Sequence, residues 1–181
     1  YNQHPQTLHN AGLSQPYYSR HDIAHLARGE VKLFLQCYYH QMAALQDRET
    51  YTFWEHYYLL SIHKTHEEAW FLMQTRWMFY YEPDMETLRL FPAVPRAYFT
   101  AGAQPGLERA GSYFGKLTFR TECTEESIKC TWSCERPAPK VEIRLPHPEG
   151  KHAVKCTGGI YDAERETVIT SGTTGAVELR F

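Results

Sequence analysis

The stretch Thr52–Arg76, TFWEHYYLLSIHKTHEEAWFLMQTR, brings acidic, histidine and large aromatic side chains to the start of a strongly apolar helical pattern. Thr65 and Glu68 have the spacing of a capping box, in which a hydroxyl and a carboxylate satisfy the first free N–H groups of a helix. We therefore predict a helix from Thr65 to about Tyr81, ending before Pro83. Apolar residues cover nearly every angle of this helix, so we expect protein on most of its sides.

A second helical pattern precedes this stretch. Apolar residues recur at three-then-four spacing from Asp22 to Gln46, which predicts one long amphipathic helix with Asp22 as its N-cap. After residue 84 the apolar period changes to two, which is typical of strands. The predicted strands are Leu88–Phe91, Leu107–Ala110, Lys116–Thr121, Ser127–Ser133, Lys140–Leu145, Ala153–Cys156, Thr167–Thr170 and Ala176–Phe181. We expect an α+β chain with a helical segment at 1–84, a proline-rich connector at 85–106 and an antiparallel β-sandwich at 107–181.

Composition narrows the class of protein. The chain has 181 residues, of which 43% are hydrophobic and 14% aromatic, and its net charge is −2, so we expect one large or two small globular domains. No apolar run is long enough to predict a membrane span, and the balanced charge argues against a nucleic-acid partner. The chain begins without Met and without a secretory pattern, so we expect a portion of a longer protein, and the sequence assigns no compartment.

The five cysteines match neither a redox pair nor a paired zinc motif. We interpret them as buried thiols, with a disulfide from Cys123 or Cys156 to Cys130 or Cys134 as the alternative.

Four phrases carry a resemblance that extends from Gln15 to Phe181. They are TYTFWEHYYLLSIHKTHEEAWFLMQTRWM, TLRLFPAVPRAYF, SYFGKLTF and IRLPHPEGKHAV. In order and spacing they resemble the C-terminal portion of large bacterial glycoside-hydrolase-like proteins built on an (α/α)6 barrel. The resemblance implies that this chain holds the last helices of such a toroid and a C-terminal β-sandwich. It also implies a carbohydrate substrate and no cofactor.

Glu55 is the candidate catalytic residue. The arrangement Phe53-x-Glu55-x-Tyr57 resembles the late loop that carries the base glutamate in some (α/α)6 glycosidases. Aromatic neighbours such as Trp54 suit sugar faces and desolvate a carboxyl group, which raises its pKa, whereas the neighbouring His56 or Lys64 would lower it again. The alternative is a buried structural carboxylate held by His56 or Arg76.

A second cluster lies at the start of the predicted helix. If Glu68 completes the capping box, then His63, Lys64, His66 and Glu67 remain to bind substrate at a helix N-terminus. The alternative is a solvated charge cluster at a capped helix. We expect no metal site, because Trp70 stands where a second zinc-binding histidine would be required.

The helical segment should need a partner, because two or three helices cannot cover a helix that is apolar on all sides. We expect either the remaining barrel helices or self-association through a face defined by Trp70, Phe71, Trp77 and Met78.

Two functions remain open. One is the C-terminal part of a glycoside hydrolase, inactive without the general acid that other helices would supply. The other is a noncatalytic carbohydrate-binding or structural interaction module, in which an exposed Trp132 would stack on a sugar, although a single strand Trp is more often core. Arg89 and Arg96 are interpreted as structural, pairing with carboxylates at the barrel rim.

Overall fold

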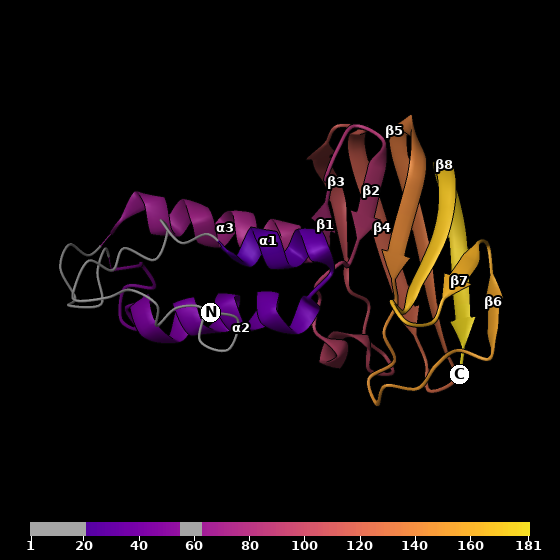
Figure 1. Ribbon diagram of the computed structural model, residues 1–181, viewed down its shortest axis with the longest axis horizontal. Coiled ribbons are helices and arrows are strands. Elements are labelled where there is room, and N and C mark those ends of the chain that lie inside the picture. Colours follow the sequence, from indigo (N-terminus) through magenta and orange to yellow (C-terminus); the bar gives the residue numbers. More distant parts are fainter. Residues whose placement is uncertain (1–20, 55–62) are drawn as a thin grey trace. The chain divides into compact units, whose positions relative to one another are not determined.

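The computed structural model describes residues 21–54 and 63–181, and the chain divides into two compact units, one up to Trp77 and one from Met78 (Figure 1). The described part of the first unit is helical and the second is built on a sheet, so the protein is α+β. The helices are α1 (His21–Arg28), α2 (Val31–Leu45) and α3 (Thr65–Phe79), whose last two residues belong to the second unit. None of these three is long and apolar enough to cross a membrane.

The predicted long helix is wrong at one point, because it is broken between α1 and α2. Gly29 adopts a left-handed φ of 76°, and its N–H donates to the Leu26 carbonyl at 3.0 Å. The N–H of Glu30 donates to the His25 carbonyl at 2.9 Å, which completes a Schellman C-cap. A side-chain hydrogen bond between the Glu30 carboxylate and His25 Nδ1, at 2.5 Å, also spans this turn. Glycine ends the helix here because it pays no steric penalty in this conformation.

The predicted caps also differ from the structure. Asp22 lies inside α1 and is buried, and its Oδ2 accepts hydrogen bonds from Trp70 Nε1 at 3.1 Å and Gln74 Nε2 at 2.8 Å, so it is not the N-cap. Helix α3 begins at Thr65 as predicted. However, Glu68 Oε1 is buried and has no hydrogen-bond partner among residues 21–54 and 63–181, so this oxygen does not make the bond that a capping box requires.

Helix α3 packs within its own unit through aromatic rings. The Phe71 ring lies 5.1 Å from that of Tyr38 and 5.0 Å from that of Phe53, and the Trp70 and Trp77 rings meet edge to face at 5.1 Å. Part of the face predicted to associate therefore contacts other segments of the chain, since Phe71 packs against Tyr38 and Phe53 and Met78 is itself buried, whereas Trp70 and Trp77 are half-buried. Helix α3 also has an unusual distribution of exposed and buried side chains. Leu72 is 67% exposed, whereas the polar residues Glu67 and Gln74 of the same helix are fully buried.

The second unit forms, within the described residues, one eight-stranded mixed sheet rather than a purely antiparallel one. Its strands are β1 (Tyr80–Tyr81), β2 (Thr87–Leu90), β3 (Gly106–Ser112), β4 (Gly115–Cys123), β5 (Ser127–Arg144), β6 (Lys155–Thr157), β7 (Ile160–Asp162) and β8 (Thr167–Arg180). The pair β2–β5 is parallel, and the other ladders are antiparallel. A parallel pair is possible here because a long connection, including β3 and β4, separates the two strands.

Two pairs of predicted strands are single long strands in the structure. Ser127–Ser133 and Lys140–Leu145 fall on β5, and Thr167–Thr170 and Ala176–Phe181 fall on β8. The β5–β8 register shifts between Ser133 and Val141, where β5 carries Pro137 and Pro139. Proline cannot donate to a sheet ladder, so irregular pairing is expected at this point. The first part of β5 also pairs with β4 and the last part with β2.

The predicted connector 85–106 is part of this unit. It supplies β2 and a 3₁₀ helix, Arg96–Phe99, and its residues Ala93 and Val94 are fully buried. The Phe91 ring meets Phe99 at 5.5 Å and Phe119 of β4 at 4.9 Å, both edge to face, so the stretch LRLFPAVPRAYF helps to build the core of the sheet unit. Trp132 is 3% exposed, which confirms the core interpretation and removes it as a sugar-stacking platform.

All five cysteines lie in the described residues and are free thiols. Four are buried as predicted, and Cys156 is half-buried. Burial raises the pKa of the Cys37 thiol to about 12, with the nearby Asp22 carboxylate adding to the effect, so this thiol stays protonated at neutral pH.

Candidate functional site

The loop side of the helical unit holds most of the predicted site. Glu55 and His56 lie outside the described residues, so the proposed catalytic carboxylate is not placed. The flanking residues are placed: the Trp54 N–H donates to the Leu45 carbonyl at 2.9 Å, and the Lys64 N–H donates to the Phe53 carbonyl at 3.0 Å. These backbone bonds bring Trp54 and Lys64 together, although eight residues of undescribed chain and His63 separate them in sequence.

His63, Lys64 and His66 lie at the entrance to α3. His63 has a left-handed φ of 66° and an exposed side chain, and the side chain of His66 is also exposed. The Lys64 carbonyl accepts the amides of Glu67 at 3.0 Å and Glu68 at 3.1 Å, which starts the helix. The structure therefore brings Trp54 and these three residues to one end of the helical unit.

An acidic turn borders this surface. Asp47 Oδ1 accepts the amides of Thr50 at 2.9 Å and Glu49 at 3.0 Å. These hydrogen bonds, led by the one from Thr50, hold the pKa of Asp47 below its usual range, and the charge of His63 contributes the least of the causes. Asp47 therefore remains ionised near His63 and offers a hydrogen-bond acceptor that the sequence analysis does not identify.

Glu67 does not lie on the surface with His63 and His66. Its side chain is fully buried, and its Oε2 accepts a hydrogen bond from Gln41 Nε2 of α2 at 3.1 Å. Its carboxylate therefore faces the interior of the helical unit. Together with Asp22 and Gln74, it forms a polar layer between the helices. Sequence reasoning missed this layer because it assigned Asp22 to a cap and Glu67 to a substrate-binding surface.

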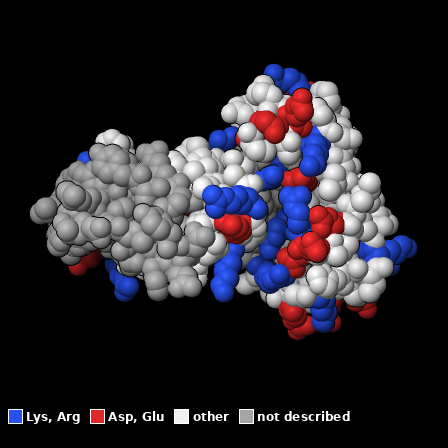
Figure 2. All heavy atoms as spheres, viewed as in Figure 1, with Lys and Arg blue, Asp and Glu red and all other residues white. Residues whose placement is uncertain are grey.

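A charged network crosses the outer face of the sheet, and Figure 2 shows Lys and Arg side chains interspersed with Asp and Glu over this unit. Glu142, which is 3% exposed, is bound by Arg89 Nε at 2.8 Å, Lys140 Nζ at 2.7 Å and Arg165 Nη2 at 3.1 Å. Burial alone would raise the pKa of Glu142, but the hydrogen bonds from Arg165 and Lys140 outweigh burial and lower this pKa to about 2.

A second carboxylate, Glu166, is surrounded by its own pair of arginines. Glu166 receives Arg96 Nη1 at 2.6 Å and Arg144 Nη2 at 3.3 Å. Arg96 also donates to the His147 carbonyl at 2.9 Å, and Arg144 donates to the Val94 carbonyl at 3.0 Å. Arg89 and Arg96 thus have the structural pairing that their sequence context predicts, but their carboxylate partners belong to the sheet unit itself.

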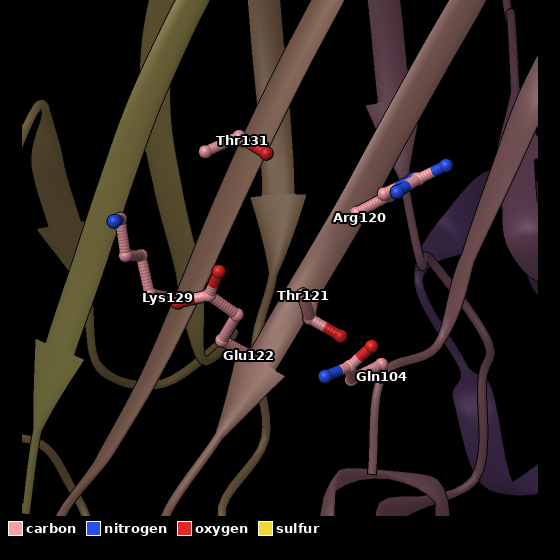
Figure 3. Close-up of a pocket in the computed structure, with 6 residues that line it drawn as sticks. All are labelled: Gln104, Arg120, Thr121, Glu122, Lys129 and Thr131. Atoms are coloured by element: carbon pink, nitrogen blue, oxygen red, sulfur yellow. The ribbon is translucent and has the colours of Figure 1, made fainter.

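A polar hollow of about 250 Å³ lies over β4 and β5 (Figure 3). Its lining comes from two neighbouring strands and the loop before β3, and consists of Gln104, Arg120, Thr121, Glu122, Lys129 and Thr131. The ladder places Arg120 opposite Thr131 and Glu122 opposite Lys129. The hollow therefore presents charged groups of both signs, the Thr131 hydroxyl and an amide, whereas the Thr121 hydroxyl is buried and donates to the Pro105 carbonyl. Its residues are separated in sequence, so only strand pairing reveals the cluster.

No metal centre is found in residues 21–54 and 63–181, because these contain no group of three or more His, Cys, Asp or Glu side chains that could hold an ion. Comparison of the chain with protein-family models, curated proteins and solved structures finds no match. The function must therefore be argued from the residues and their geometry.

Proposed function

We propose that the chain is the C-terminal part of a carbohydrate-cleaving enzyme, in which α1–α3 are late helices of an (α/α)6 toroid and the sheet unit is a β-sandwich scaffold. The proposal starts from the sequence resemblance over Gln15–Phe181. The order of a helical unit followed by a sheet unit agrees with it. Fold order alone does not identify a function, so the proposal needs support from the packing of α3.

The observation that carries the proposal is the reversed polarity of α3. Glu67 and Gln74 are fully buried, whereas Leu72 of the same helix is 67% exposed. A helix in a complete small bundle would expose the polar residues and bury the leucine. Protein packed against the Leu72 side would bury the leucine, and further helices of a toroid would supply that protein. The proposed partner is therefore the rest of the barrel, with self-association through the helical unit as the alternative.

In the proposed site, Glu55 acts as general base, and Trp54, His56, His63, Lys64 and His66 bind the sugar chain around it. A glycosidase needs two carboxyl groups on opposite sides of the scissile bond. Glu67 is fully buried and bonded to Gln41 inside the helical unit, which supports a structural role for it rather than the predicted role in substrate binding. The general acid would then come from the remaining helices, and the chain alone is expected to be inactive.

The test is hydrolysis of a polysaccharide panel by the longer protein that contains this chain, measured as release of reducing ends. Glu55→Gln should lower kcat about 10²–10⁴-fold, the usual loss when an acid or base group is removed. The matched control is Glu49→Gln, which removes an exposed carboxylate from the neighbouring turn and should leave the rate unchanged. Equal activity of the Glu55 variant, or full activity of residues 1–181 alone, would refute the proposal.

A further inference from the structure

We propose that the hollow over β4 and β5 binds one sugar unit of a carbohydrate chain, at a site separate from the helical unit. The inference rests on the proposed carbohydrate function and adds a second contact for the same class of ligand. It also gives the sheet unit a role in sugar binding that does not require Trp132, which is buried.

The wall of the hollow is fixed by the backbone. Pro105 O accepts both the amide of Thr121 at 3.0 Å and its hydroxyl at 2.8 Å, so the loop that carries Gln104 is held against β4. Gly106 permits this close approach, because a Cβ at that position would lie 2.4 Å from the Phe119 carbonyl oxygen. Gln104 is therefore presented by a tethered loop, which reduces the entropy lost when a ligand binds.

Of the charged groups that line the hollow, Arg120 forms an ion pair with Glu108 of β3, which leaves Glu122 and Lys129 as the charges that could meet a ligand. Glu122 and Lys129 are direct cross-strand partners, a position at which opposite charges usually pair. Among the residues that the structure describes, however, no ion pair joins them. Glu178, which faces Lys129 from β8, pairs with Arg180 at 3.0 Å instead. The Glu122 carboxylate and the Lys129 ammonium therefore keep acceptors and donors for a ligand.

The mixture of groups selects the ligand class. An inorganic anion would be opposed by Glu122, and a cation by Lys129. The lining has no aromatic or aliphatic side chain that would hold an apolar molecule. A sugar hydroxyl both donates and accepts, so a polyol can satisfy Glu122, Lys129 and the Gln104 amide together. A volume of about 250 Å³ limits the occupant to a single small unit.

The experiment uses the full 181-residue chain, labelled with ¹⁵N and titrated with cellobiose, maltose or lactose while amide shifts are recorded. At least one disaccharide should shift the amides of Gln104, Thr121, Lys129 and Thr131 with a Kd on the order of millimolar, because the site is open to water. Glu122→Ala and Lys129→Ala should each weaken binding about tenfold or more, since each removes a charged hydrogen-bonding partner. Glu135→Ala, an exposed carboxylate elsewhere on the sheet, should leave Kd unchanged.

Three results would overturn the inference: no shift at these amides with any of the sugars, equal binding by the Ala variants, or the same shifts produced by sodium sulfate alone. A parallel titration of the Glu55→Gln chain separates this inference from the proposed function. Shifts at the hollow should persist in that variant, whatever the activity of the longer protein. A hydrolytic longer protein with a silent hollow would reject only the sheet site.

Discussion

Glu142→Gln tests the charge network that holds the sheet unit together. The substitution keeps the size of the side chain but removes the charge that Arg89, Lys140 and Arg165 surround. Lowering the pKa of Glu142 from its usual 4.5 to about 2 corresponds to about 3 kcal/mol of stability from the ionised form. The cation side chains are 20%, 47% and 44% exposed, so water would replace part of the lost interaction. We therefore expect a loss of about 2 kcal/mol in the free energy of unfolding at pH 7.

The pH dependence gives a second measurement on the same residue. Because the folded-state pKa of Glu142 lies below the unfolded value, its stabilisation is fully present above about pH 4.5 and is lost as the pH falls toward 2. Urea unfolding at pH 7 and pH 3, followed by the sheet signal in circular dichroism, should show a smaller difference between the two pH values for the variant than for the wild type. Glu135→Gln, whose partner Lys116 lies 4.0 Å away at an exposed site, is the control and should change stability by less than about 0.5 kcal/mol. A Glu142 variant as stable as the wild type at pH 7 would refute the reasoning.

Three further outcomes follow from the packing. Gly29→Ala should lower the free energy of unfolding of the helical unit by about 1–2 kcal/mol, measured by urea unfolding. The φ of Gly29 is 76° and no atom lies within 4 Å of the added Cβ, so the cost comes from the backbone conformation alone. An unchanged unfolding midpoint would contradict the helix break. Phe119→Ala should cost about 3–5 kcal/mol in the sheet transition, since the ring is fully buried against Phe91, and a loss below about 1 kcal/mol would contradict that packing. When a thiol reagent is added to the native protein, Cys156 should react first. Cys130 should react only after unfolding, because burial raises the pKa of its thiol. The reverse order would show that Cys130 is accessible in the native protein.

The local elements follow from the sequence, because short-range chemistry determines them. Helix α3 begins at Thr65, and β2 lies within a residue of the predicted Leu88–Phe91, since apolar periodicity and turn residues act over a few positions. Gly29 also carries a local signal for a helix end, but the regular apolar spacing on both sides of it favoured one continuous helix. The break is decided by the left-handed backbone at that residue.

Which groups meet across the fold was decided only by the tertiary structure. The sequence indicates that Arg89 needs a carboxylate, but strand pairing places it beside Glu142, a residue far along the chain. The sequence likewise placed Glu67 in a charged cluster at a helix start, whereas the structure buries its carboxylate against Gln41 of another helix. Periodicity tells which residues share a face of one element, but it contains no information about the neighbour that the face meets. For this protein, composition and period determined the α+β class, and long-range pairing determined the parallel β2–β5 ladder, the buried carboxylates and the polar hollow.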